Sequence, residues 1–321
     1  MARRCSGRSW VGKVQSAALG RHTVLILAGL LLGWVPALEA QTVLFQDTFH
    51  NGNPTQVKGE SPHFWKTVNS GLGHYGRFSL TEKDGALVME ATNTSAQQAA
   101  LGLSCASLQP FNFITGPVRF EVSGLSVHGS TPNASNLYFD VTAKATSTAY
   151  LDQGCTRFGL RLRGDNAMQL GWRINHPGPS VLGTALTSFM NLGPGAITGF
   201  QLTLDGSSWV ARPATGGLKY DLRFACAPDN PSDSNHDGWI DSGDTGFASL
   251  AGQFSPADSA QFIKSWLAEN GNVPAAQAKA SLSFQDRVTA GAAGVSSTVE
   301  LKKIAVVALL PAKDAGAGGR P

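Results

Sequence analysis

The chain has 321 residues, with 25 Lys and Arg against 22 Asp and Glu. The first 40 residues contain five of the basic residues and one acidic residue, so the remainder has 20 basic and 21 acidic residues and a net charge of −1. The chain beyond residue 40 therefore has no basic excess that would favour nucleic acid or an anionic membrane as a partner.

Residues 1–40 have the pattern of a secretory signal peptide. Five basic residues come first, residues 23–35 are apolar, and small residues follow at Ala37 and Ala40, either of which suits a cleavage site. The apolar run is too short to span a bilayer comfortably, and no later run is long enough. We therefore expect an exported protein, secreted, periplasmic or at the cell surface, with no membrane span after cleavage.

Short runs of alternating apolar and polar residues dominate the chain from residue 41 onward. Such alternation predicts half-buried antiparallel strands. The expected strands are residues 42–49, 76–81, 86–91, 116–127, 136–144, 156–163, 168–175, 200–205, 208–212, 218–224, 280–286 and 297–308. Asp-Gly or Gly-Asp pairs at 84–85, 164–165 and 205–206 predict tight hairpin turns between them. The expected fold class is all-β, an antiparallel two-sheet jelly-roll sandwich.

The two ends of this region resemble concanavalin A-like lectin/glucanase domains, which include LamG-like modules. Residues 44–49 read Leu-Phe-Gln-Asp-Thr-Phe, with Asn51-Gly52 and Trp65 beyond, like the opening strand of those domains. Residues 297–309 resemble their last strand, which the resemblance implies pairs with the first. The resemblance assigns a sandwich to residues 41–312, and we expect a flexible tail at 313–321.

Residues 233–244 place oxygen-bearing side chains at the spacing of a calcium-binding loop. Asp233, Asn235, Asp237, Asp241 and Asp244 occupy positions one, three, five, nine and twelve, Gly238 is at position six, and Trp239 offers its carbonyl at position seven. The loop resembles an EF-hand, and more closely the dockerin variant with Asp at position twelve. Calcium is the expected cofactor. The same residue types also favour ordinary solvated turns, and the sequence leaves that alternative open.

The calcium loop belongs to a segment, residues 227–279, that interrupts the strand pattern. Ser255 and Pro256 suit the N-cap and first position of a helix, and Asn270-Gly271 suit its end. Phe262, Ile263, Trp266 and Leu267 would form its apolar face. We expect a small insertion, loop plus helix, between two late strands.

Three cysteines follow the signal segment: Cys105, Cys155 and Cys226. Export permits a disulfide, but an odd number leaves one thiol over, and the sequence does not say which two would pair. Their wide spacing excludes a zinc knuckle or a C-x-x-C redox motif.

No catalytic residue is predicted. The Glu-x-Asp-x-x-Glu signature of the resembled glycoside hydrolases is absent, and Glu121 and Asp140 each stand alone in their expected strands. His63, His74 and His176 belong to no recognisable cluster. Aromatic rings can stack on sugars, which makes Trp65, Tyr75, Trp172 and Trp209 candidates for glycan contact, with filling of the core as the alternative.

The sequence therefore predicts an exported calcium-binding β-sandwich that is a non-catalytic carbohydrate-binding or surface-interaction module. An extracellular glycan or a surface protein would be its partner. Two alternatives stay open: a diverged polysaccharide hydrolase or lyase, and a structural or adhesive protein that uses the calcium loop for protein contacts.

Overall fold

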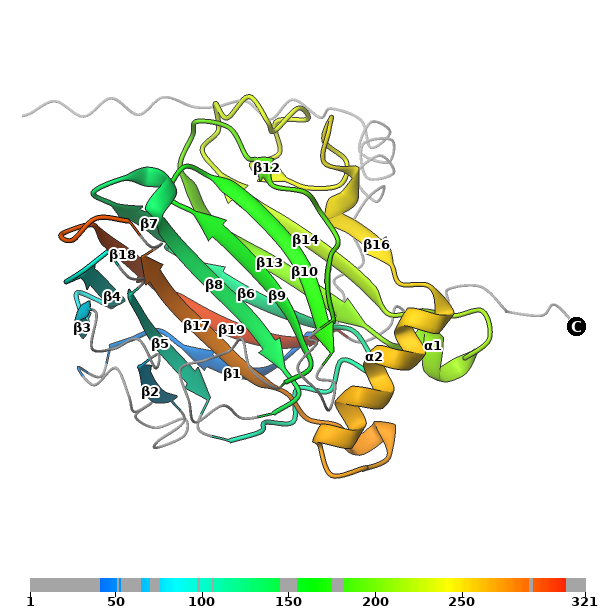
Figure 1. The fold of residues 1–321 in the computed structure, drawn as a ribbon. Coiled ribbons are helices and arrows are strands. Elements are labelled where there is room, and N and C mark those ends of the chain that lie inside the picture. The colour runs from blue at the N-terminus through cyan, green and yellow to red at the C-terminus, as the bar shows by residue number, and fades with distance from the viewer. Residues whose placement is uncertain are drawn as a thin grey trace, which may run out of the picture. The chain divides into compact units, whose positions relative to one another are not determined.

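Most strands belong to two large antiparallel sheets in the computed structural model, which describes residues 41–50, 52, 65–69, 76–96, 99–105, 107–144, 155–174, 182–288 and 291–309 (Figure 1). The strands of the back sheet are β1 Gln41–Asp47, β6 Val118–Ser123, β13 Ile197–Asp205, β14 Lys219–Cys226, β15 Trp239–Ile240, β16 Ala251–Gln253 and β19 Lys303–Leu309. Their order is β1-β19-β6-β13-β14-β15, and β16 also pairs with β14.

The front sheet has eight strands. They are β2 Trp65–Asn69, β5 Ala99–Cys105, β8 Ser135–Thr142, β9 Arg157–Arg163, β10 Ala167–Ile174, β11 Leu182–Ala185, β12 Met190–Asn191 and β17 Ser281–Val288. Their order is β11-β10-β9-β8-β17-β5-β2, with β12 beside β10. The Phe139 ring of β8 lies 5.2 Å from the Phe200 ring of β13, so the inner faces of the two sheets share one core.

A third sheet of four strands continues two strands of the back sheet. Its strands are β3 Gly76–Lys83, β4 Ala86–Asn93, β7 Ser126–Gly129 and β18 Ser296–Leu301, in the order β3-β4-β18-β7. The expected single strands 116–127 and 297–308 each divide, into β6–β7 at Gly124 (φ +62°) and into β18–β19 at Lys302. Bends of this kind let one long strand serve two sheets.

The first and last strands pair as the sequence predicted. Strand β1 runs antiparallel to β19, from Gln41 opposite Leu309 to Asp47 opposite Ile304. The motif at residues 44–49 also stabilises this end of the sandwich. The buried Asp47 carboxylate accepts hydrogen bonds from the Phe49 backbone N–H at 2.9 Å and from Trp65 Nε1 at 2.9 Å, which ties β1 to β2.

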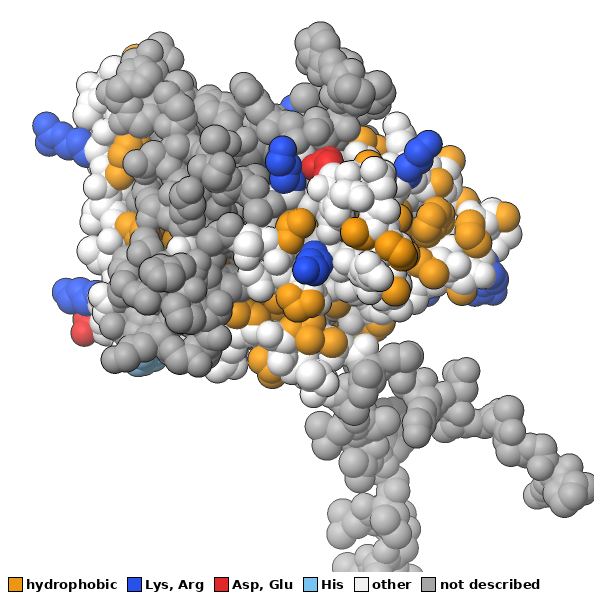
Figure 2. All heavy atoms as spheres, turned by 90° about the horizontal axis from the view of Figure 1, so that it is seen from below, with side chains coloured by type: hydrophobic (Ala, Val, Ile, Leu, Met, Phe, Trp, Pro, Cys, Tyr) orange, Lys and Arg blue, Asp and Glu red, His pale blue; other side chains and the backbone are white. Residues whose placement is uncertain are grey.

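Helix α2, Pro256–Glu269, lies where the sequence placed it. The Ser255 hydroxyl accepts a hydrogen bond from the Asp258 backbone N–H, as an N-cap should. Phe262, Ile263 and Trp266 are at most 1% exposed. The Phe262 ring packs edge-on against Trp172 of β10, at 5.8 Å. The helix thus covers one edge of the sandwich (Figure 1). Seen from below, the described surface has many apolar side chains and few acidic ones (Figure 2).

The expected strand at 208–212 is wrong, because α1, Ser207–Ala211, is a short helix. The Asp205 carboxylate accepts a hydrogen bond from the Ser207 backbone N–H at 2.9 Å, so Asp205-Gly206 begins a helical turn and not a hairpin. The hairpins at 84–85 and 164–165 are confirmed, joining β3 to β4 and β9 to β10. Three short 3₁₀ helices complete the described elements: Pro132–Ala134, Ala248–Leu250 and Ala275–Gln277.

The expected signal segment and the tail at 313–321 lie outside the described residues. No helix among the residues described is long and apolar enough to cross a membrane.

Candidate functional site: the Asp-rich loop and the outer face of the front sheet

The loop at residues 233–244 is anchored on the back sheet. Its residues at positions seven and eight form β15, which pairs with Phe224 and Ala225 of β14, and the Ile240 side chain is fully buried. Positive φ angles at His236 (61°) and Gly238 (87°) turn the chain sharply before this pairing. The backbone thus has the sharp turn at position six that a calcium loop requires.

The oxygen-bearing side chains of this loop accept hydrogen bonds from its own backbone. Asp233 is fully buried, and its two carboxylate oxygens accept the N–H groups of Asp237 at 3.2 Å and Gly238 at 2.9 Å. Asp244 accepts from the N–H and hydroxyl of Ser234 and from the Asp241 N–H. Burial alone would raise the pKa of Asp244, but these hydrogen bonds outweigh it and lower the pKa.

Each of the three remaining oxygen-bearing side chains of the loop accepts a hydrogen bond from the backbone N–H two residues later. Asn235 accepts from the Asp237 N–H, Asp237 from the Trp239 N–H, and Asp241 from the Gly243 N–H, all within 3.0 Å. In the part of the chain that the structure describes, no three His, Cys, Asp or Glu side chains are gathered closely enough to hold a metal ion. The ligand types and backbone turn suit calcium, whereas the side chains would have to turn inward to bind it.

Two cysteines are free thiols: Cys155 and Cys226, both buried. Burial raises the pKa of Cys155 to about 12 and, aided by the neighbouring Asp233 carboxylate, that of Cys226 to about 11. Both thiols therefore stay protonated at neutral pH, which makes them poor nucleophiles. The side chain of Cys105 is not among those described.

The predicted stacking aromatics are mostly core residues. Trp65 is 2% exposed and packs against Phe45, and Trp172 is 8% exposed and packs against Phe254, although Trp172 is also among the residues that line the hollow described below. Trp209 is half-buried against the core. Tyr75 lies outside the described residues, as do His63, His74 and His176.

The outer face of the front sheet is polar and hollowed. Alternation along β9 points Phe158, Leu160 and Leu162 into the core and turns the arginines outward. Strand register then sets outward residues side by side across the sheet. One row reads Gln285, Tyr138, Arg161, Gln169, and the next reads Ser283, Asp140, Gly159, Gly171, from β17 to β10.

Aromatic rings and guanidinium groups alternate along this face. The Arg287 and Arg161 guanidinium carbons lie 5.2 Å and 5.4 Å from the centroid of the Tyr138 ring. Arg161 and Arg163 lie 5.0 Å and 5.6 Å from the centroid of the Phe189 ring. We call these five residues the cation–aromatic ladder. Phe189 is 43% exposed and is thus a large ring that solvent or a ligand can reach.

A hollow of about 270 Å³ lies beside the ladder. Tyr138, Asp140, Arg157, Arg161, Gln169 and Arg173 line it, together with the glycines of β9 and β10. Gly159 keeps the hollow open, because a Cβ atom there would meet Asp140 Oδ1 at 2.3 Å. Asp140 itself is 4% exposed, and its Oδ1 lies 3.7 Å from Arg157 Nε. Concave sites lined by a few polar groups and aromatic rings are typical of small-ligand binding.

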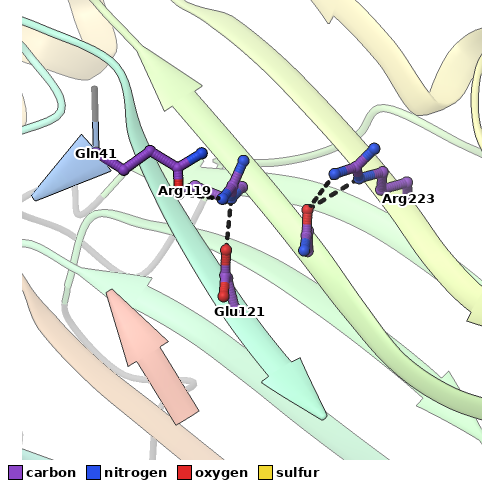
Figure 3. Close-up of polar contacts among 5 residues, drawn as sticks. Gln41, Arg119, Glu121 and Arg223 are labelled. Atoms are coloured by element: carbon purple, nitrogen blue, oxygen red, sulfur yellow. Dashed lines mark hydrogen bonds and ion pairs between the residues drawn. The ribbon is translucent and has the colours of Figure 1, made fainter. Parts of the chain in front are cut away.

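The outer face of the back sheet also holds arginine side chains beside acceptors. Arg119 donates to Glu121 at 2.6 Å and to Gln41 at 3.1 Å, and Arg223 donates to Gln201 at 2.9 Å and 2.6 Å (Figure 3). The Arg223 guanidinium also lies 4.4 Å from the centroid of the Trp239 ring, which comes from the Asp-rich loop. Both arginines thus have a neighbouring acceptor, and Glu121 is engaged in an ion pair.

The ladder and the hollow were missed from the sequence. A signal existed in residues 157–163, where Arg, Gly, Arg and Arg occupy alternate positions of an expected strand and so share one face. Phe189 had no such signal, since its position beside Arg161 and Arg163 depends on the path of the chain after β11.

No protein-family model and no curated protein matches this chain. Similar solved structures include a glycoside hydrolase family 16 endo-glucanase from Bacteroides ovatus, with 8% identity, a TM-score of 0.44, and coverage of 82% of this chain and 100% of that one. A UEA-II lectin bound to galactose has 10% identity, a TM-score of 0.41, and coverage of 84% and 100%. An endo-acting O-glycanase of the human gut microbiota has 11% identity, a TM-score of 0.47, and coverage of 84% and 100%. With identities this low and TM-scores below 0.5, these likenesses say nothing about function or family, and the antiparallel β-sandwich rests on this chain's own strand pairing.

Proposed function

We propose that this chain is an exported, non-catalytic glycan-binding β-sandwich protein and that the outer face of the front sheet is its binding face. The observation behind the proposal is the cation–aromatic ladder beside the hollow of about 270 Å³. Sugar recognition combines stacking on an aromatic ring with hydrogen bonds to ring hydroxyls. Tyr138 and Phe189 offer rings, and Gln169, Asp140 and the arginines offer donors and acceptors.

The non-catalytic part of the proposal rests on the surroundings of Asp140. Retaining glycosidases need two carboxyl groups about 5–5.5 Å apart, and inverting ones about 6.5–9.5 Å apart. The direct cross-strand partners of Asp140 are Ser283 and Gly159, neither of which is acidic. Arg157 Nε lies 3.7 Å from Asp140 Oδ1, so a charged neighbour that the structure describes for this carboxylate is a cation and not a second acid.

Glycan-array binding of the exported chain tests this function. We expect retention of at least one class of glycan with no release of reducing ends or unsaturated sugars. Released product would instead support the hydrolase or lyase alternative. Phe189→Ala should weaken binding about tenfold or more through the lost ring, while Val210→Ala, an equally exposed apolar side chain on α1, should not change it.

We also propose that residues 233–244 bind calcium, with ligands from Asp233, Asn235, Asp237, Asp241, Asp244 and the Trp239 carbonyl. Supporting this are the ligand spacing, the positive φ at Gly238, and the anchoring of position eight in the core. The carboxylates would exchange backbone hydrogen bonds for the ion. A bound ion adds stability by mass action, about 2.7 kcal/mol when calcium is at 100 times its dissociation constant.

Isothermal titration with CaCl₂ tests the calcium site. The double variant Asp237→Asn with Asp241→Asn should abolish calcium uptake and leaves the buried Asp233 in place. The double variant Asp233→Ala with Asp237→Ala should also abolish calcium uptake. Asp229→Ala, an exposed acid just outside the loop, is the control. Equal calcium affinity in all variants would exclude the site. Calcium-dependent capture of a surface protein would favour the adhesive alternative over glycan binding.

Export is proposed from the first 40 residues. Sequencing the N-terminus of the protein recovered outside the cytoplasm should give a start just after Ala37 or Ala40. A start at Met1 would refute cleavage.

A further inference from the structure

The outer face of the front sheet has an excess of positive charge. Arg157, Arg161, Arg163, Arg173 and Arg287 all belong to strands of this face. In the described part of the same face and its hairpin, the acids are Asp140 and Asp165. The chain beyond residue 40 has a net charge of −1, so the positive charge is local to this face. A local excess of this kind attracts anions.

The arginines are held in position by aromatic rings and by the two acids of this face, because Arg163 is ion-paired with Asp165 and Arg157 lies 3.7 Å from Asp140. Arg161 lies between the Tyr138 and Phe189 rings, and its Nε donates to Asn136 Oδ1 at 2.8 Å. Stacking against rings occupies the two faces of a guanidinium group. The in-plane N–H groups other than Nε–H can then bind an acceptor. Such planar, fixed N–H pairs match the two oxygens of a carboxylate or the oxygens of a sulfate.

The crowding of the guanidinium groups also favours anion binding. Burial lowers the pKa of Arg161, and the neighbouring Arg163 and Arg287 guanidinium groups lower it further, while Tyr138 acts in the opposite direction. An anion bound between these groups would relieve their mutual repulsion.

The spacing of the cations suits a chain with repeated charges. Arg157 and Arg161 lie four residues apart on β9, a separation of about 13 Å at 3.3 Å per residue. Gly159 lies between them, opposite Gly171 of β10, and both glycines line the hollow. A sugar unit in the hollow would thus have positive charge on both sides along the strand.

We infer that this face binds an acidic polysaccharide, whose carboxylate or sulfate groups pair with Arg157, Arg161 and Arg163 while a sugar unit occupies the hollow. This inference rests on the proposed glycan-binding function and names its ligand class. A nucleic acid also offers repeated anions, but an expected export signal and a hollow of about 270 Å³ beside exposed Phe189 favour a saccharide.

Titration with four polymers tests the inference: polygalacturonate for carboxylates, heparin for sulfates, mixed-linkage β-glucan as the neutral polymer, and single-stranded DNA. We expect binding to polygalacturonate or heparin, at least tenfold tighter than to the other two. This binding should weaken steeply between about 50 and 500 mM NaCl, because screening shortens the reach of charges. Binding of polygalacturonate would show that carboxylates suffice, and binding of heparin without polygalacturonate would show that sulfates are needed.

The double variant Arg161→Gln with Arg163→Gln should weaken acidic-polymer binding at least tenfold. Arg119→Gln removes a cation from the back sheet and should leave it unchanged. Circular dichroism and melting temperature would show that both variants fold. If the double variant unfolds, Arg157→Gln alone provides the same test at the other end of the hollow.

Three outcomes overturn the inference in different ways. Binding of neutral glucan with no preference for acid would refute the ligand class and leave glycan binding intact. Binding of DNA as tight as that of the acidic polymers would refute polysaccharide specificity. No binding of any of the four polymers would refute the inference, and the glycan array would show separately whether the glycan-binding function fails with it.

Discussion

Asp286 carries its carboxyl group inside the molecule, where β17 packs against the third sheet. It is fully buried, and the Ser297 hydroxyl donates to its Oδ1. Burial, with Glu90 nearby, raises the pKa of Asp286 from 3.8 to about 8, against hydrogen bonds that lower it. The folded chain therefore binds this proton far more tightly than the unfolded chain does.

This raised pKa predicts a pH-dependent stability. Because the folded-state pKa exceeds the unfolded one, the contribution of Asp286 is fully present below about pH 4 and is lost as the pH rises toward 8. Asp286→Asn stays neutral and should remove this dependence. Melting temperatures of both proteins measured from pH 5 to pH 8.5 should converge, or cross, toward high pH. Parallel curves would show that Asp286 titrates normally.

Arg161 and Arg163 occupy alternate positions of β9 and therefore lie on the same face of the sheet. Their alternation predicts a shared face from the sequence alone. That Tyr138 and Phe189 stack against them depends on strand register and on the path after β11, which are tertiary features.

At the scale of elements, helix α2 belongs to the core of the sandwich. Its Trp266 is 1% exposed, its ring lies 4.8 Å from that of Phe113, and its Nε1 donates to the Lys279 carbonyl at 2.9 Å. The capping and apolar periodicity of this helix were predicted from the sequence. Its place at the edge of the sandwich, against Trp172 of β10, was not.

Trp266→Ala should therefore lower the free energy of unfolding by about 3–5 kcal/mol, as expected for a large aromatic side chain removed from a core. Denaturation by urea measures the change. Lys264→Ala, two residues away and exposed, should change stability by less than about 0.5 kcal/mol. Similar small losses in both variants would mean that α2 is packed loosely.

At the scale of the whole molecule, residues 227–279 interrupt the strand pattern of the sequence, but their side chains pack in the same core as the strands. Ile240, Phe262 and Trp266 belong to the same hydrophobic cluster as Phe139 and Phe200 of the two main sheets. A single shared core unfolds as one cooperative unit.

Replacing residues 227–279 with a short Gly-Ser linker should thus abolish cooperative unfolding, because it removes Phe254, whose ring packs against Trp172, Phe158 and Tyr220. Scanning calorimetry of the exported chain should show one transition, and the deleted form none. A deleted form that melts sharply would show that the insertion is a separable domain.

The pairing of the first and last strands was implied by the family resemblance of the two ends. The sequence by itself determined the antiparallel β-class, the hairpins at 84–85 and 164–165, and helix α2. These follow from local causes: side-chain alternation, turn residues and capping. Only the tertiary structure decided that strands bend into a third sheet, that Trp65 and Trp172 lie in the core, and that Arg173, Arg287, Tyr138 and Phe189 share one face with the alternating arginines of β9. Those features depend on strand register and on contacts between distant segments, and no local pattern encodes either of them.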